Sequence, residues 1–263
     1  MSQLPSAIEQ RIAEARRLWL FLDYDGTLAE FAPTPDYVEA DPALVALIAR
    51  LAQHPRFRVA VVSGRQLRQV QELVSVPGVW LAGTYGIELQ TAEGERIDRL
   101  EFDRLRPTLD SLKPEWAALI VGREGFFLED KGWAMALHAR FAADDEAEQV
   151  LADARRLASA AIEGTGEQKF RLLGGHKFLE IGPRLAHKGL TVAYLLDHYP
   201  WSGALPLYLG DDDKDEEAFG VIKERGGVAV VVASEPRPSR ADLRLGSPQA
   251  ARCWLETLLD ARV

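Results

Sequence analysis

Short apolar runs that end abruptly in polar residues recur along the chain. The three clearest are LWLFL before DYDGT, RVAVV before SGR, and LPLYL before GDDDKDE. Continuous apolar runs of this length are typical of strands that are buried on both faces, as in parallel sheets. We therefore expect buried strands at 18–22, 58–62 and 205–209, each with polar residues at its carboxyl end.

Amphipathic segments lie between these runs. The clearest has Asp41 as a helix N-cap and Pro42 at the first helical position, followed by apolar residues at helical spacing. Similar spacing predicts helices at about 66–74, 190–198, 216–223 and 248–259. Alternating strands and helices predict an α/β fold with a doubly wound, Rossmann-like parallel sheet. In such sheets ligands bind beyond the carboxyl ends of the strands.

The middle of the chain follows a different pattern. It predicts a helix from about residue 102, a strand pair, an alanine-rich helix at about 144–162, and a second strand pair. Gly174 and Gly175 are expected to form the two-residue turn of that second pair. Antiparallel strands with helices on one side indicate a small α+β domain inserted into the larger one.

The inserted domain sets the expected domain boundaries. We place an α+β cap at 104–182, between two parts of the core at 1–103 and 183–263. A lid that opens and closes is the natural hypothesis for such an insertion.

Composition narrows the class of protein. A chain of 263 residues with 47% hydrophobic content can bury a sizeable core. The single cysteine, Cys253, excludes an internal disulfide and a cysteine zinc site, and we expect it in the core of the last helix. A reducing compartment, the cytoplasm, is the expected location.

Charge and hydropathy indicate which kinds of partner the protein can bind. The N-terminal segment lacks the apolar centre of a signal peptide, and no run approaches the ~18 apolar residues that span a membrane. A net charge of -9 argues against nucleic acid. We expect a monomer that binds neither membranes nor nucleic acid, and whose anionic ligands are held by local cations.

Two carboxylates, Asp23 and Asp25, end the first strand. Residues two apart point the same way there, so both side chains can face one small site. Two like charges held close raise one pKa or require a cation. A divalent ion with oxygen ligands, Mg2+, resolves the conflict. The acidic run after the third strand completes the candidate metal site, with Asp211 as a direct ligand and Asp212 or Asp215 supporting metal-bound water.

A carboxylate beside a metal can attack a phosphoryl group. Asp23 would be the nucleophile, and Asp25 would protonate the leaving oxygen and later take a proton from water. Gly26 permits a tight turn, and Thr27 can brace the loop through its hydroxyl.

Polar residues after the second strand suit a phosphate group. Ser63 can donate its hydroxyl, Gly64 lets the backbone approach closely, and Arg65 either adds charge or orients the loop. Lys188 is expected at the start of a helix, where the helix dipole disfavours a cation. A bound phosphate would remove that penalty.

Each signature also has a plain structural interpretation. An acidic pair after a strand is often a solvated loop or a helix cap, and the run from Asp211 to Glu217 could be only a solvated face. A calcium loop requires glycine at its sixth position and glutamate at its twelfth. Here those positions hold Glu216 and Ile222, so a calcium loop is excluded.

Four sequence motifs occur in the same order as in a known superfamily. DYDGTL, VVSGR, HKG and GDDDKDEEAF resemble the ordered motifs of the haloacid dehalogenase superfamily of phosphohydrolases. The resemblance implies a haloacid dehalogenase core with an inserted α+β cap, and an aspartyl-phosphate intermediate.

Within that superfamily the chain resembles the trehalose-6-phosphate phosphatase family. That family carries a G-x-H-G-x-E segment, and this chain has GTYGIE, with Tyr85 at the histidine position. Its last motif usually has threonine where this chain has Lys214. The resemblance also implies that cap residues hold the sugar: Glu129, Lys131, His138 and Glu180.

The resemblance implies hydrolysis of trehalose 6-phosphate, a phosphorylated disaccharide, with Mg2+ as cofactor. The alternatives are a phosphatase for sucrose phosphate or for a glycosyl phosphoglycerate, and a non-catalytic sugar-phosphate sensor. Asp23 and Asp25 argue against a sensor, which needs neither a nucleophile nor an acid.

Overall fold

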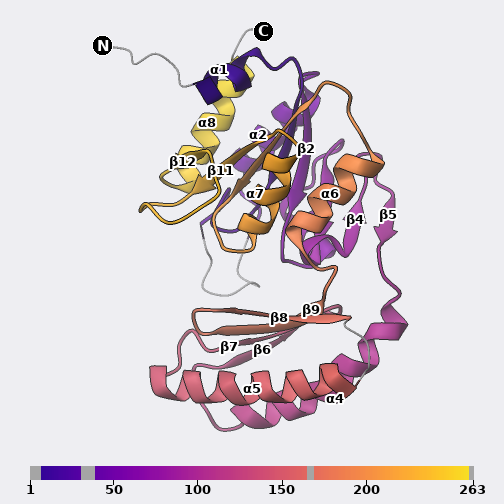
Figure 1. Ribbon diagram of the computed structural model, residues 1–263, viewed down its shortest axis with the longest axis vertical. Coiled ribbons are helices and arrows are strands. Elements are labelled where there is room, and N and C mark those ends of the chain that lie inside the picture. Colours follow the sequence, from indigo (N-terminus) through magenta and orange to yellow (C-terminus); the bar gives the residue numbers. More distant parts are fainter. Residues whose placement is uncertain (1–6, 31–38, 165–168, 261–263) are drawn as a thin grey trace. The chain divides into compact units, whose positions relative to one another are not determined.

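The chain divides into two compact units. The first comprises residues 1–97 and 187–263, and the second comprises residues 98–186. The structure is a computed structural model that describes residues 7–30, 39–164 and 169–260 (Figure 1). The second unit is wider than the cap range expected from the sequence, because its first helix begins at Phe102 and its last strand ends at Pro183.

A sheet of eight strands forms the centre of the first unit. Its order is β12-β11-β10-β1-β2-β3-β4-β5, with parallel pairing from β12 to β3 and an antiparallel step to β4. The bounds are β1 (Leu18–Leu22), β2 (Phe57–Val62), β3 (Trp80–Gly83), β4 (Glu88–Gln90), β5 (Arg96–Asp98), β10 (Leu205–Gly210), β11 (Val228–Val232) and β12 (Leu243–Leu245). The three strands expected from the apolar runs are β1, β2 and β10, so this prediction is confirmed.

Both faces of this sheet are buried, which explains why its strands are apolar throughout. In β1, Leu18 and Leu20 pack into one hydrophobic layer, while Trp19 and Phe21 pack into the opposite layer. One layer includes helices α1 (Ala7–Glu14), α2 (Pro42–Gln53), α3 (Leu67–Leu73) and α8 (Pro248–Asp260), and the other includes α6 (Lys188–His198) and α7 (Asp215–Glu224). The doubly wound architecture is therefore confirmed.

The five helices expected in this unit from the sequence are also confirmed. Asp41 caps α2, because its Oδ1 accepts a hydrogen bond of 2.9 Å from the Ala43 amide, and Pro42 is the first helical residue. The other four expected helices correspond to α3, α6, α7 and α8.

The second unit is a four-stranded antiparallel sheet with two helices. The sheet order is β6-β7-β9-β8, and α4 and α5 lie on the same side of it (Figure 1). Trp116 of α4 donates its indole N-H to the Ala154 carbonyl of α5 over 3.0 Å, which joins the helices. The bounds are α4 (Phe102–Ile120), β6 (Phe127–Asp130), β7 (Met135–His138), α5 (Asp144–Gly164), β8 (Phe170–Gly175) and β9 (Phe178–Pro183).

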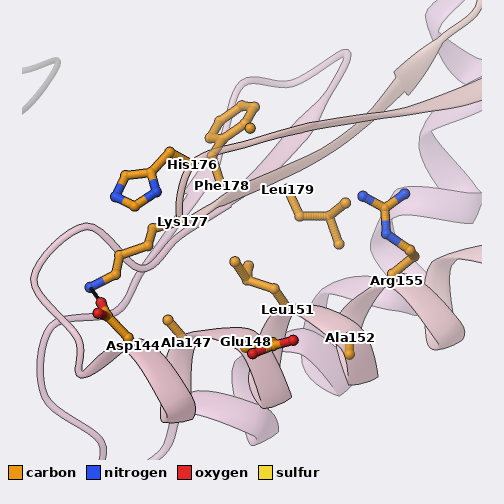
Figure 2. A pocket seen from close by; sticks show the side chains of 11 residues that line it. Asp144, Ala147, Glu148, Leu151, Ala152, Arg155, His176, Lys177, Phe178 and Leu179 are labelled. Atoms are coloured by element: carbon orange, nitrogen blue, oxygen red, sulfur yellow. Dashed lines mark ion pairs between the residues drawn. The ribbon is translucent and has the colours of Figure 1, made fainter.

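The turn between β8 and β9 differs from the expected one. Gly175 pairs with Phe178, so His176 and Lys177 form the turn, and Gly174 and Gly175 belong to the strand. Lys177 adopts a left-handed φ of 53°. Its ammonium lies 2.6 Å from Asp144 Oδ1 at the start of α5, as Figure 2 shows. This tertiary contact favours the turn at Lys177 over the glycine pair.

Cys253 is also placed differently from its expected position. The buried residues of α8 include Ala251 and Leu255, and Cys253 lies between them in sequence on the exposed side of the helix. Of the helices that the structure describes, none is both long and apolar enough to cross a membrane.

Arg56 joins the amino-terminal end of the core sheet to two helices. Its buried guanidinium donates to the carbonyls of Ala15, Ile12, Ala13 and Leu258. Burial lowers the pKa of Arg56, but the four carbonyls accept hydrogen bonds from all three of its nitrogens.

Replacing Arg56 should therefore destabilise the core unit. We expect Arg56→Met to lower the free energy of unfolding by about 2 to 4 kcal/mol, because buried carbonyls lose charged donors. Urea denaturation measures this. Arg50→Met is the control, because Arg50 is exposed and should change stability by less than about 0.5 kcal/mol. Equal effects of the two changes would contradict the role of Arg56.

Candidate active site

Three carboxylates meet at the carboxyl end of the core sheet. Asp23 follows β1, and its amide continues the ladder by donating to the Leu209 carbonyl of β10 over 2.9 Å. Oxygens of Asp23, Asp211 and Asp215 all lie within 4.8 Å of one another. The sheet therefore brings together the carboxylates of two neighbouring strands, as the sequence suggested.

Lys188 lies buried among these carboxylates. Its Nζ is 2.7 Å from Asp23 Oδ1 and 2.6 Å from Asp215 Oδ1. Lys188 is the first residue of α6, as expected from the sequence. The helix dipole disfavours a cation at that position, and the two carboxylates offset this effect.

Asp215 is the most constrained of the three carboxylates. Its Oδ1 also accepts a hydrogen bond of 2.7 Å from the Tyr208 hydroxyl, and its Oδ2 accepts from the amides of Asp211 and Asp212. Asp215 thereby fixes the shape of the loop after β10. The sequence marks Tyr208 only as the polar-tipped residue of an otherwise apolar strand, which does not predict this contact.

Burial dominates the electrostatics of this cluster. It raises the pKa of Asp23 to about 8 and of Asp215 to about 8, even though Lys188 lowers both. Burial and then Asp215 raise the pKa of Asp211 to about 6. Burial also disfavours the Lys188 ammonium, but Asp215 and Asp23 outweigh it and hold the Lys188 pKa well above its usual value. Full ionisation of all three carboxylates beside one ammonium would leave an excess of negative charge.

The residues present fit a divalent cation. Their donors are carboxylate oxygens, which hard cations prefer, and a cation would stabilise the ionised forms that burial disfavours. Asp212 lies beside the cluster. Burial would raise its pKa, but Lys188 and Lys214 lower it to about 2, so its carboxylate is ionised. The roles of Asp211, Asp212 and Asp215 toward a metal remain predictions.

The loop after β1 is braced as expected. Gly26 has a φ of 81°, which permits the tight turn, and the Thr27 hydroxyl lies 2.9 Å from both Asp23 Oδ2 and Asp211 Oδ1. Thr27 therefore links the loops after β1 and β10.

Asp25 is held by an arginine from the neighbouring loop. The Arg65 guanidinium contacts it in a bidentate pair, with Nε 2.7 Å from Oδ2 and Nη2 2.7 Å from Oδ1. The sequence left open whether Arg65 adds charge or orients the loop, and the pair indicates orientation of Asp25. The Asp25 carboxylate is not part of the Asp23, Asp211 and Asp215 cluster found among the described residues.

The loop after β2 carries Ser63 and Gly64. Ser63 is buried, its Oγ accepts from the Arg65 amide over 3.1 Å, and its carbonyl accepts from the Tyr85 amide over 2.8 Å. A side chain at Gly64 would collide with the Tyr85 ring, since an added Cβ would lie 2.7 Å from Cε1. Glycine is thus required by the close approach of Tyr85.

The four residues assigned to sugar binding form a separate cluster in the second unit. Lys131 Nζ lies 2.6 Å from Glu180 Oε2, and His138 Nε2 lies 2.9 Å from Glu129 Oε2. Cross-strand pairing places Glu129, His138 and Glu180 on one face of the cap sheet. Glu180 is fully buried, and its Oε1 has no hydrogen-bond partner among the described residues. Such an orphaned oxygen suits a hydroxyl donor from a ligand.

A hollow of about 450 Å³ lies elsewhere in the second unit, between α5 and the β8–β9 turn (Figure 2). None of the residues expected to bind sugar or phosphate lines it.

The placement of these groups defines a class of protein. Aspartates end the adjacent strands β1 and β10, a serine loop follows β2, and an α+β unit interrupts the chain after β5. This is a haloacid dehalogenase-type core with an inserted cap. The family model for trehalose-phosphatase matches residues 21–249, and the chain belongs to the trehalose-phosphatase family.

Individual proteins with similar sequences carry the name of the same family. Trehalose-phosphate phosphatase of Mycobacterium bovis is 34% identical over 255 residues, which cover 93% of this chain and 62% of the relative. The protein of the same name from Mycobacterium avium is 32% identical, covering 99% of this chain and 68% of the relative. The chain thus spans 62% of the length of the first of these relatives.

Solved structures share the fold. The C-terminal domain of the Candida albicans trehalose-6-phosphate phosphatase has a TM-score of 0.84 at 19% identity, with 95% of this chain and 94% of that chain covered. A trehalose-6-phosphate phosphatase related protein has a TM-score of 0.76 at 19% identity, with coverages of 92% and 97%.

The raised pKa values predict pH-dependent metal binding. Protons on Asp23, with a pKa of about 8, and on Asp211, with a pKa of about 6, compete with a cation. We expect the affinity for Mg2+ to fall as the pH falls from 8 to 6, by up to about tenfold per pH unit for each competing proton. Calorimetric titration with MgCl2 measures this.

Asp213→Asn supplies the control for that titration. The Asp213 side chain is 96% exposed and pairs with Arg237, so its replacement should preserve the pH dependence. An affinity for Mg2+ that is the same at pH 8 and pH 6 would exclude the buried carboxylates as the metal site.

Proposed function

We propose that this chain is a Mg2+-dependent phosphatase that hydrolyses trehalose 6-phosphate to trehalose and phosphate. The observation that carries the proposal is the buried cluster of Asp23, Asp211 and Asp215 around Lys188, at the sheet edge where α/β proteins bind ligands. The names of the mycobacterial relatives support the choice of substrate.

The positions of the side chains suit nucleophilic catalysis by a carboxylate. An oxygen of Asp23 attacks phosphorus, the bond to the leaving sugar oxygen breaks, and an aspartyl phosphate forms. Lys188 Nζ and the Thr27 hydroxyl hold the two Asp23 oxygens and thereby orient the nucleophile. Ser63 and the backbone near Gly64 would bind phosphate oxygens. Hydrolysis of the intermediate then releases phosphate and restores Asp23.

Asp25 is suited to proton transfer. It would donate a proton to the leaving oxygen and later accept one from the attacking water. Because both Asp25 oxygens contact Arg65, one of them must exchange that contact for the substrate during the reaction. Arg65 thus holds Asp25 until substrate binds.

Mg2+ bound by Asp23 and Asp211, with Asp212 or Asp215 in support, would neutralise charge between the nucleophile and the phosphoryl group. The grouping of three carboxylates supports this assignment, because a cation would stabilise their ionised forms.

The cluster in the second unit supports a sugar ligand. Glu129, Lys131, His138 and Glu180 offer several acceptors and donors on one side of the cap sheet, and a disaccharide presents many hydroxyl groups. We propose that these residues bind sugar hydroxyls.

A panel of phosphorylated sugars tests the substrate. With excess Mg2+, we expect kcat/KM for trehalose 6-phosphate to exceed that for sucrose phosphate and for a glycosyl phosphoglycerate by at least about 100-fold, because pockets that bind hydroxyls reject mismatched patterns. Released inorganic phosphate is measured. Efficient hydrolysis of another sugar phosphate, with none from trehalose 6-phosphate, would reject the proposed specificity.

Two isosteric changes test the catalytic roles. We expect Asp23→Asn to lower kcat by at least about 1,000-fold while ligand binding persists, because the amide is not a nucleophile. Asp25→Asn should lower kcat by about 100- to 10,000-fold, with the larger losses for poor leaving groups. Stopped assays of phosphate release measure both. Unchanged turnover of the Asp23 variant would exclude it as the nucleophile.

A change in the cap separates sugar binding from phosphate chemistry. We expect Glu129→Gln to raise KM for trehalose 6-phosphate about tenfold, because a charged acceptor for hydroxyls is lost. Its kcat/KM for p-nitrophenyl phosphate, which lacks a sugar, should stay within about twofold of wild type. Glu115→Gln makes the same chemical change on the exposed side of α4 and should affect neither substrate. Equal losses on both substrates would contradict a sugar contact at Glu129.

A further inference from the structure

Three aromatic side chains lie next to one another across the cap sheet. Phe127 of β6 pairs with His138 of β7, and His138 pairs with Phe178 of β9. The ring centroids of Phe127 and His138 are 5.8 Å apart, and those of His138 and Phe178 are 5.2 Å apart. The three residues form an aromatic row. Because neighbouring strands are about 4.8 Å apart, this row crosses about 10 Å of the sheet.

The aromatic row lies on the face of the sheet that is turned away from α5. Figure 2 shows the Phe178 ring directed away from this helix, whereas the next residue, Leu179, is directed toward it. Leu179 is buried, but 46% of the Phe127 surface and 28% of the His138 side chain are exposed. A single exposed apolar residue is common on a protein, whereas a patch of adjoining exposed rings often marks a binding site.

A polar row runs beside the aromatic row on the same face. It consists of Glu129 and Glu180, which face each other across Ala136 and lie two residues along their strands from the aromatic row. A step of two residues returns to the same face and covers about 7 Å. Glu129 Oε2 lies 2.9 Å from His138 Nε2, and this contact joins the two rows. The cap sheet therefore presents aromatic rings and hydroxyl-binding groups side by side.

This combination of groups matches the chemistry of a pyranose sugar. A glucopyranose carries its hydroxyl groups around the rim of the ring and presents C-H groups on its two faces. The hydroxyl groups can pair with carboxylates such as those of the polar row. The C-H groups carry a small positive charge, so they pack favourably on the negative face of an aromatic ring. The same negative face would repel a phosphate group, so the aromatic row favours the sugar part of the substrate.

We propose that the aromatic row packs against a pyranose ring of the phosphorylated disaccharide while the polar row binds sugar hydroxyl groups. Phe127 and Phe178 thereby determine selectivity for a disaccharide phosphate over a monosaccharide phosphate. The reason is geometric, because two sugar rings can cover both rows at once, whereas one ring covers a single row. The inference rests on the proposed function and adds two residues to the four that were assigned to sugar binding.

Replacing Phe127 tests the aromatic row, because Phe127→Leu removes the ring and keeps an apolar side chain at a half-exposed position. We expect KM for trehalose 6-phosphate to rise about three- to tenfold, with kcat within about twofold of wild type. Phe127→Tyr keeps the ring and should restore KM to within about twofold. The kcat/KM for acetyl phosphate, which has neither a sugar nor a ring, should change less than about twofold. Assays of phosphate release measure all of these values.

Phe141→Leu is the matched control for Phe127→Leu. Phe141 is 70% exposed in the same unit and lies outside the aromatic row, so its replacement should leave KM for trehalose 6-phosphate unchanged. Glucose 6-phosphate tests the selectivity. In Phe127→Leu, the ratio of kcat/KM for trehalose 6-phosphate to that for glucose 6-phosphate should fall about three- to tenfold. The dissociation constant of trehalose, measured by calorimetric titration, should rise in parallel with KM.

Three outcomes would overturn the role of the aromatic row: an unchanged KM in Phe127→Leu, an equal loss on acetyl phosphate, or a Phe127→Tyr variant as impaired as Phe127→Leu. If Phe127→Leu does not fold, as thermal unfolding would reveal, Phe178→Leu is assayed in its place. A wild-type chain that hydrolyses no sugar phosphate would instead overturn the proposed function. Titration of wild type and Phe127→Leu with trehalose then decides separately. Binding at least about threefold weaker in the variant supports the aromatic row, and equal binding, or none by wild type, overturns it.

Discussion

A buried ammonium between carboxylates organises the core unit of this protein. Lys188 lies within 2.7 Å of both Asp23 and Asp215. Each of these groups alone would be costly to bury, and each is tolerated because the others are present. The pairing is incomplete, since Asp211 adds a third carboxylate that the single ammonium cannot balance. A divalent cation would offset that imbalance.

The parallel sheet is what brings these charges together. Strands β1 and β10 are neighbours, so residues that follow them meet at one edge, although they are far apart in sequence. Helix α6 starts at the same edge and contributes Lys188. The loops are then tied to one another by Thr27, by the Asp25–Arg65 pair and by the Tyr85–Lys214 contact. Each tie joins residues from different strand ends, so a change in one loop affects its neighbours.

The two faces of the sheet in the second unit differ in chemical character. Met135 and Leu137 share one face of β7 and are buried apolar residues. The alternate residues include Glu129, His138 and Glu180, which form the polar cluster. A strand period of two places apolar and polar residues on opposite faces of one short sheet. Polar groups are maintained at such buried positions at a cost in stability, which supports a binding role for them.

Periodicity and residue type along the chain were enough to identify the strands β1, β2 and β10, the helix starts at Pro42 and Lys188, and the acidic residues at the strand ends. These features are local, because burial on both faces and helix capping act on neighbouring residues. The turn at Lys177, the exposure of Cys253, the Arg65 contact with Asp25 and the meeting of Tyr85 with Lys214 were decided only by the tertiary structure. They depend on strand order and register, which place residues that are distant in sequence within a few ångströms of each other.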